Sequence, residues 1–207
     1  MPAAELVIRP AEFADLDELY AICLRTGAAG ADATDRYADG DLLGHVYVGP
    51  YVLLESAFGL VIEADGAVVG YALAAPDTAA FADEAEQAWW PRLRRRYPAP
   101  DTEPVERTPD AALVELIHRP SPTPVELLDD FPAHVHIDLA PEAQGMGAGR
   151  RLMVEVEAEL VGRGVVGVHL GVDPANRNAA GFYEHLGYQR RTTGAGHLVF
   201  TKRLATP

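Results

Sequence analysis

One stretch of the chain decides its fold: Gln144-Gly145-Met146-Gly147-Ala148-Gly149-Arg150. It joins a segment with the alternating pattern of a β-strand to a segment with the periodicity of an α-helix. Glycine at every second position leaves the backbone N–H groups unobstructed and permits positive φ angles. At the start of a helix, unpaired N–H groups and the helix dipole together favour an anion. Arg150 and Arg151 add positive charge, so the sequence predicts that a phosphate or pyrophosphate binds here.

Two common phosphate-binding patterns do not fit this stretch. A dinucleotide fingerprint requires glycine at the sixth position of G-x-G-x-x-G, and counting from Gly145 that position is Arg150. A phosphate loop that ends in Gly-Lys-Ser/Thr cannot be built either, because the only lysine of the chain is Lys202. The predicted anion site must therefore belong to another class of fold.

Apolar periodicity outside this stretch predicts a mixed α/β protein. It predicts strands at 6–8, 59–63, 68–74, 135–139, 165–172, 188–192 and 197–204, and helices after Asp15, at 147–162 and at 176–186. Asp65-Gly66, between the second and third strands, is typical of a tight hairpin. Gly70 inside the third strand indicates a bulge or a close backbone approach. Residues 76–130 are rich in proline and carry only short helical patches, so we interpret them as a helical insertion.

A second motif follows the first at the distance that one helix and one strand require. It reads Asn-x-x-Ala-x-x-Phe-Tyr-x-x-x-Gly-Tyr and consists of Asn176, Ala179, Phe182, Tyr183, Gly187 and Tyr188. Together with Gln144, Gly147 and Gly149, read as Gln-x-x-Gly-x-Gly, it resembles the GNAT superfamily of N-acetyltransferases. Further segments look like the acetyltransferase-like C-terminal domain of O-GlcNAcases: Ile8-Arg9-Pro10, Gly70-Tyr71-Ala72-Leu73, Trp89-Trp90-Pro91, Tyr97 and Phe131-Pro132.

The resemblance implies a fold, a co-substrate and a binding loop. The implied GNAT fold is a mixed, twisted α/β sheet with helices on both faces, in which the parallel strands at 135–139 and 165–172 splay apart. Residues 1–207 then form a single acetyltransferase domain that includes the insertion at 76–130. Acetyl-coenzyme A is the implied co-substrate, bound in the splay. The residues implied to bind it are Leu139, Gln144, Gly145, Met146, Gly147, Ala148, Gly149, Arg150 and Asn176. Asn176 also suits a helix N-cap, and the sequence does not separate the two roles.

Two residues are candidates for the chemistry of acetyl transfer to an amine by direct attack. We interpret Tyr183 as the general acid that protonates the leaving thiolate, with an inward-facing core aromatic as the alternative. Asp138 ends the strand before the glycine-rich stretch, where a carboxylate can bind an ammonium group and relay its proton through water. The acceptor stays open between a protein lysine, an N-terminus, a polyamine, an aminoglycoside and an amino sugar. A non-catalytic coenzyme A-binding interaction module is the alternative function, as degenerate relatives of the O-GlcNAcase domain suggest.

A metal-dependent hydrolase is a further alternative, because His134-Val135-His136-Ile137-Asp138 resembles the His-x-His-x-Asp-His pattern of metallo-β-lactamase-like enzymes. Leu139 occupies the place of the last histidine, and the segment has the pattern of a strand. We therefore expect no metal, and either an acid–base role or a buried polar face for His136 and Asp138.

Composition limits the partners. The chain has 17 Lys and Arg against 31 Asp and Glu, a net charge of −14, which disfavours nucleic acid and attracts a cationic acceptor. No signal peptide and no membrane-length apolar run is visible, so we expect a cytoplasmic protein without a membrane partner, either monomer or homodimer. The single Cys23 excludes an intramolecular disulfide. Frequent arginine and alanine with one lysine are typical of a GC-rich bacterial genome.

Overall fold

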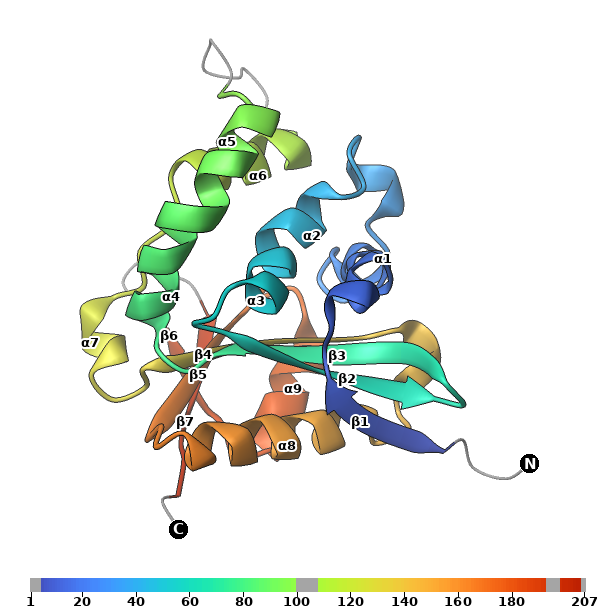
Figure 1. Ribbon diagram of the computed structural model, residues 1–207. Coiled ribbons are helices and arrows are strands. Elements are labelled where there is room, and N and C mark those ends of the chain that lie inside the picture. The colour runs from blue at the N-terminus through green and yellow to red at the C-terminus, as the bar shows by residue number, and fades with distance from the viewer. Residues whose placement is uncertain (1–4, 100–107, 193–197, 206–207) are drawn as a thin grey trace.

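The computed structural model describes residues 5–99, 108–192 and 198–205. Within them, one seven-stranded sheet has the order β1-β2-β3-β4-β5-β7-β6 (Figure 1). The strands are β1 Leu6–Pro10, β2 Phe58–Ala64, β3 Ala67–Ala75, β4 Ala133–Leu139, β5 Gly167–Val172, β6 Gln189–Thr192 and β7 Leu198–Arg203. The α-helices are α1 Leu16–Thr26, α2 Leu42–Tyr47, α3 Gly49–Leu53, α4 Thr78–Glu84, α5 Trp90–Arg96, α6 Pro109–His118, α7 Val125–Leu128, α8 Ala148–Gly162 and α9 Arg177–His185. Short turns of other helix types are η1 Phe13–Asp15, η2 Thr34–Arg36, η3 Ala85–Trp89 and η4 Pro141–Ala143.

The β4–β5 pair is the feature that opens the sheet. All other neighbouring strands are antiparallel, whereas β4 and β5 are parallel and pair only at Ala133–Val168 and His134–His169. The rest of β4, residues 135–139, pairs with β3 on one side and has no partner in β5. The fold predicted from the sequence, a mixed α/β sheet with a splayed parallel pair, is confirmed.

Helices cover both faces of the sheet (Figure 1). One face is covered by α8, which contacts β2, β3 and β4. Its buried side chains are the ones expected from helical periodicity: Leu152, Met153, Val156 and Leu160. The opposite face is covered by α1, which contacts β3 and β4, and by α3, which contacts β2 and β3. The ends of β4 and β5 therefore lie between two helical layers, where a ligand can be enclosed.

Glycines determine the local geometry of β3. The β2–β3 hairpin turns at Asp65 and Gly66, whose φ angles of 51° and 84° are both positive, as a type I′ turn requires. The register between β2 and β3 shifts between Ile62 and Glu63, opposite Gly70 and Val68. A Cβ atom on Gly70 would lie 2.4 Å from Leu139 Cδ2, so β4 packs where only glycine fits. The predicted hairpin and the predicted close approach at Gly70 are both confirmed.

Strand β5 begins at Gly167, two residues after the predicted start at residue 165, because the turn that ends α8 extends to Val165. Gly164 has φ of 79°, and the Val165 N–H donates to Leu160 O at 3.0 Å while the Gly164 N–H donates to Val161 O at 2.9 Å. These two bonds form a Schellman cap, which holds Val165 in the helix terminus and leaves the strand to begin at Gly167.

The insertion between β3 and β4 contains α4 to α7. The π-helical turn η3 separates α4 from α5 and ends two residues before Pro91, which has no N–H to donate. The arginines of α5 are not merely solvated: Arg94 donates to Ile117 O of α6 at 3.0 Å, and Arg96 pairs with Asp41 beside α2 at 3.4 Å. The insertion is thus fastened to the helical layer over the sheet.

The first residue of β5 gives a stability prediction. A Cβ atom on Gly167 would lie 2.3 Å from Asp130 O and 2.9 Å from Phe131 Cδ1, and the backbone atom cannot yield as a flexible side chain would. We expect Gly167→Ala to lower the free energy of unfolding by about 2–3 kcal/mol, measured by thermal or denaturant unfolding. Gly171→Ala is the matched control, since a Cβ atom there meets nothing within 4 Å. Equal stability of the two variants would contradict this close packing of β5 against residues 130–131.

Candidate functional site

A cavity of about 600 Å³ opens where β4 diverges from β5. Its walls come from four places: the end of α1 with the loop after it, the end of β4, the glycine-rich stretch with the start of α8, and α9. The lining residues are Thr26, Ala29, Gly30, Ala31, Ile137, Asp138, Leu139, Gln144, Gly145, Gly147, Ala148, Gly149, Arg150, Asn176, Asn178, Ala179, Phe182, Tyr183, His185 and Leu186. The two sequence motifs, far apart along the chain, thus face each other across one cavity.

The glycine-rich stretch presents unobstructed backbone to this cavity. Gly145 and Gly147 both have φ of 79°, and a Cβ atom on either would meet nothing within 4 Å. Gly147 is the N-cap of α8 and has no side chain to bond the first turn; the Arg151 N–H donates to Gly147 O at 3.1 Å. The N–H groups of residues 148–150 therefore lie in the first turn, ahead of any intrahelical bond. This open, dipole-favoured end fits a phosphate or pyrophosphate group.

Other residues of the stretch have structural roles beside the cavity. A Cβ atom on Gly149 would lie 3.1 Å from Leu139 Cδ1 and 3.2 Å from Phe182 Cζ, so this glycine allows α8, β4 and α9 to pack closely. The Gln144 Nε2 group donates to Leu139 O at 3.2 Å and fastens the loop to the end of β4. Met146 is 44% exposed and is not among the described residues that line the cavity. Some residues of the stretch therefore leave backbone N–H groups open to the cavity, and others fasten the loop to β4 and α9.

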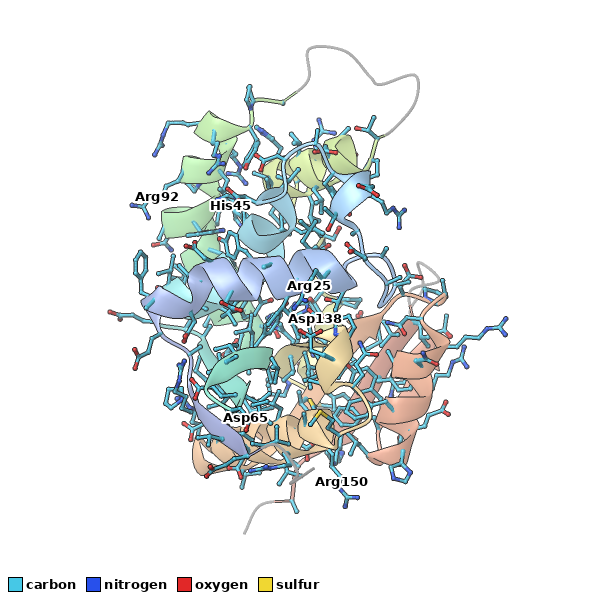
Figure 2. All side chains as sticks on the ribbon, turned by 90° about the vertical axis from the view of Figure 1, so that its right-hand side faces the viewer. Arg25, His45, Asp65, Arg92, Asp138 and Arg150 are labelled. Carbon is cyan, nitrogen blue, oxygen red and sulfur yellow. The ribbon has the colours of Figure 1, made fainter. Side chains whose placement is uncertain are left out.

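Asp138 lies at the cavity wall beside the end of α1, near the labelled Arg25 (Figure 2). Its carboxylate accepts a hydrogen bond from Tyr71 Oη at 2.6 Å and another from Thr26 Oγ1 at 3.0 Å. Burial raises the pKa of this carboxyl to about 6, although both hydrogen bonds act to lower it. A carboxyl with its pKa near neutrality is suited to exchange protons with a substrate.

Tyr183 projects from α9 into the same cavity and is 7% exposed. Its ring packs against Phe182, Tyr188 and Phe200, with ring centroids 5.2–5.7 Å away. Its hydroxyl makes no hydrogen bond to the described part of the chain. Burial raises the pKa of the phenol, and the negative charge of Asp138 raises it further. Tyr183 is thus a core aromatic whose protonated hydroxyl is left for a ligand.

Asn176 is the N-cap of α9. Its Oδ1 atom accepts a hydrogen bond from the Ala179 N–H at 3.0 Å. On the other side, its Nδ2 atom would lie 3.1 Å from a Cβ atom on Gly30, which has φ of 90°. The capping role is therefore observed, and the same side chain brings the start of α9 against the loop after α1.

One histidine of β4 is fully bonded to neighbouring side chains. His134 already has a partner at each ring nitrogen: Tyr51 Oη lies 2.7 Å from Nε2, and Thr78 Oγ1 lies 2.8 Å from Nδ1. Among the residues that the structure describes, no group of three His, Cys, Asp or Glu side chains is arranged to hold a metal ion. The described helices also include none long and apolar enough to cross a membrane.

For several residues of the site, no pattern in the sequence indicates a role there. The loop at 29–31 forms a wall of the cavity, and Tyr71 and Thr26 hold Asp138. The pattern of β3 contains Tyr71 as an ordinary apolar position, so only the strand register, which pairs Tyr71 with Asp138, identifies its role. His118 Nε2 lies 2.8 Å from Tyr97 O, and this contact joins α6 to the end of α5.

Comparison with known proteins agrees with this geometry. The acetyltransferase (GNAT) family model matches residues 30–188. The crystal structure of SsHAT is 35% identical and superposes with a TM-score of 0.87 over 97% of this chain and 99% of that one. A phosphinothricin acetyltransferase from Sinorhizobium meliloti, solved with AcCoA, gives a TM-score of 0.56 at 17% identity over 97% of this chain and 89% of that one, and so shares the fold.

A curated relative matches over a short part of its own length. Protein O-GlcNAcase from Rattus norvegicus is 23% identical over 180 residues, which are 87% of this chain and 20% of that protein. The chain therefore spans about a fifth of the curated relatives that it matches. The similarity to the O-GlcNAcases that the sequence motifs indicated is confirmed over this region.

Proposed function

Because the chain belongs to the acetyltransferase (GNAT) family, we propose that it transfers the acetyl group of acetyl-coenzyme A to an amine by direct attack. The observation that carries the proposal is the open glycine-rich start of α8 at the splay of β4 and β5, with Asp138 and Tyr183 on the walls of the same cavity. Structural neighbours include acetyltransferases solved with coenzyme A or with acetyl-coenzyme A.

In this proposal the chain's own backbone binds the pyrophosphate. The backbone N–H groups of residues 145–150 bind the anion at the positive end of the α8 dipole. Arg150 adds a positive charge at the cavity wall. Asn176, at the start of α9, is placed to contact the arm that runs from the pyrophosphate toward β4. Leu139, whose carbonyl is held by Gln144, ends the strand beside which the thioester lies.

Acetyl-coenzyme A supplies the acetyl group as a thioester. The amine nitrogen of the acceptor attacks the carbonyl carbon, so that a carbon–nitrogen bond forms and the carbon–sulfur bond breaks. Asp138 takes the proton that the ammonium group must lose, directly or through water. Tyr183 gives its phenolic proton to the leaving sulfur, and burial keeps that phenol protonated until then. The second proton, which the nitrogen loses as the amide forms, passes through water to the Tyr183 oxygen and restores the phenol. We further propose a cationic acceptor, since Asp138 and the net charge of −14 both attract one.

The insertion belongs to this catalytic unit, and we propose that residues 1–207 act as one domain with 76–130 as its helical insertion. Support comes from contacts between the insertion and the loop before α2. Tyr97 Oη donates to Asp39 Oδ2 at 2.7 Å, and Asp110 Oδ1 accepts from the Ala38 N–H at 3.1 Å. Trp89 Nε1 donates to His45 O at 2.8 Å. Through these bonds the insertion supports the helices next to the cavity.

The assay that tests the proposal measures free thiol released from acetyl-coenzyme A with a panel of amines. The panel should include a lysine peptide, a polyamine, an aminoglycoside and an amino sugar. We expect calorimetric binding of acetyl-coenzyme A and amine-dependent thiol release. Binding of coenzyme A without release for any amine would favour the non-catalytic binding module instead. Absence of binding would contradict the assignment of the cavity.

Tyr183→Phe tests the proposed acid. The change keeps the packed ring and removes a hydroxyl that has no partner among the described residues, so the unfolding temperature should barely move. Turnover should fall on the order of 10²-fold, while the Kd for coenzyme A stays the same. Tyr188→Phe is the matched control: Tyr188 is also buried but donates to Glu157 Oε1 at 2.9 Å, so its loss should affect stability and spare turnover. Unchanged turnover of Tyr183→Phe would leave Tyr183 as a core residue only.

A further inference from the structure

Three histidines, His134, His136 and His169, lie near one another on β4 and β5. One of them differs from the others in its hydrogen bonding. His134 has partners at both ring nitrogens, and His169 Nδ1 is 2.8 Å from Phe131 O. His136, by contrast, makes no hydrogen bond to any residue that the structure describes. It is half-buried, and its unbonded ring nitrogens are not among the fully covered side-chain polar atoms of the described residues.

Aromatic rings surround His136. The edges or faces of Tyr51, Tyr47 and His134 contact it at centroid distances of 5.1, 5.8 and 5.9 Å. These rings offer stacking and apolar contact but no hydrogen bond to the imidazole within the described chain. Burial lowers the pKa of His136 to about 4, so the ring is neutral near pH 7. A neutral imidazole has one N–H donor and one nitrogen acceptor, and both can serve a ligand.

His136 lies on β4 close to Asp138, the residue proposed to receive the proton of the amine. It lies two residues before Asp138 and on the same face of β4, opposite Leu73 where Asp138 is opposite Tyr71. Two residues of a strand span about 6.7 Å. A ligand whose ammonium group is held at Asp138 can therefore place a second polar group at His136.

We propose that His136 selects the acceptor by a hydrogen bond to a hydroxyl or amide group about 7 Å from the reacting amine, across an apolar or aromatic spacer. The proposal rests on the proposed function and specifies its substrate class: polar, bifunctional amines rather than simple alkyl amines. The ring of Tyr47, which is half-buried and packs edge-on against His136, is placed to contact the spacer, and Asp138 receives the amine.

The test uses two pairs of amines that differ by one hydroxyl: tyramine against phenethylamine, and aminobutanol against butylamine. Calorimetry measures the affinity of each for the chain of residues 1–207 saturated with coenzyme A. We expect the hydroxylated member to bind about five- to tenfold more tightly to the wild type, the usual effect of one net hydrogen bond. In His136→Phe, which keeps a flat ring without nitrogens, the ratio should fall to about one.

Two further variants separate recognition from structure. His136→Gln retains a donor and an acceptor and should recover part of the preference, whereas His134→Gln changes a histidine whose nitrogens are already bonded and should keep the wild-type ratio. Equal affinity of both members for the wild type, including no measurable binding of either, overturns the proposal, as does an undiminished ratio in His136→Phe. Failure of coenzyme A to bind the wild type contradicts the proposed function itself and is seen before any amine is added.

Discussion

Gly147→Val should abolish the binding of acetyl-coenzyme A. Gly147 has φ of 79°, a conformation that a β-branched residue very rarely adopts, and it is the N-cap of α8. Valine would either strain this turn or reorganise it, and its methyl groups would occupy the open space in which the pyrophosphate is proposed to lie. We expect the Kd measured by calorimetry to rise by at least about 10³-fold, the loss of several charge-assisted hydrogen bonds.

Gly164→Val provides a control with the same backbone conformation. Gly164 also has φ of 79° and open space around a hypothetical Cβ atom, but it lies at the other end of α8. Its variant should lose a similar amount of stability and still bind acetyl-coenzyme A. Binding of Gly147→Val that equals the wild type would show that the cofactor does not use this loop. Equal loss of binding in both variants would assign the effect to unfolding.

Local sequence signals were sufficient to predict the backbone conformation of the glycine-rich stretch and of the β2–β3 hairpin. Both features depend on residues adjacent in the chain, since positive φ angles at Gly147, Asp65 and Gly66 follow from residue type and neighbours. Gly187, which follows α9 with φ of 85° and donates its N–H to Glu184 O at 3.0 Å, ends that helix by the same kind of local signal. Such signals located the glycine-rich loop correctly, whereas the splay of the parallel strands was implied by the resemblance to the GNAT superfamily.

The hydrogen-bond partners of the candidate catalytic groups could not be predicted from local sequence patterns. The residues that bond Asp138 lie 67 and 112 positions away, in β3 and α1, and no pattern in the sequence relates either of them to Asp138. The alternation of side chains along β4 likewise predicted that His134 and His136 share one face of the sheet. It could not show which of the two histidines has hydrogen-bond partners. That difference depends on Tyr51 and Thr78, which the tertiary packing of α3 and α4 brings to His134 alone.

Asp138→Asn should lower turnover about 10³-fold, within the usual range for removing one acid–base group. The asparagine would keep the size of the side chain and could still accept a hydrogen bond, so coenzyme A binding should be retained. In the wild type, burial raises the pKa of Asp138 to about 6, and the basic form is the ionised one. The turnover number should therefore rise with pH up to about 6 and then level off, and this limb should be missing in Asp138→Asn.

The same shift in pKa predicts an opposite effect on stability. Asp138 has a pKa of about 6 in the folded chain against an ordinary value of 3.8, so the folded state holds the proton more tightly than the unfolded state does. Its contribution to folding is most favourable below about pH 4 and is lost as the pH rises through about 6, a change of about 3 kcal/mol. At pH 8, Asp138→Asn should consequently unfold at the same temperature as the wild type or higher, although it is nearly inactive.

Tyr71→Phe tests whether the rise in turnover number up to about pH 6, the acidic limb of the pH profile, reflects the titration of Asp138. Removing the 2.6 Å hydrogen bond from Tyr71 withdraws a stabilising contact from the ionised carboxylate, so the pKa of Asp138 should rise further. The limb should then move to higher pH, with a plateau close to that of the wild type, whereas a variant that only disturbs packing would lower the plateau and leave the limb in place. A limb that stays in place in Tyr71→Phe, or persists in Asp138→Asn, would assign the titration to the acceptor amine and leave Asp138 as a structural carboxylate.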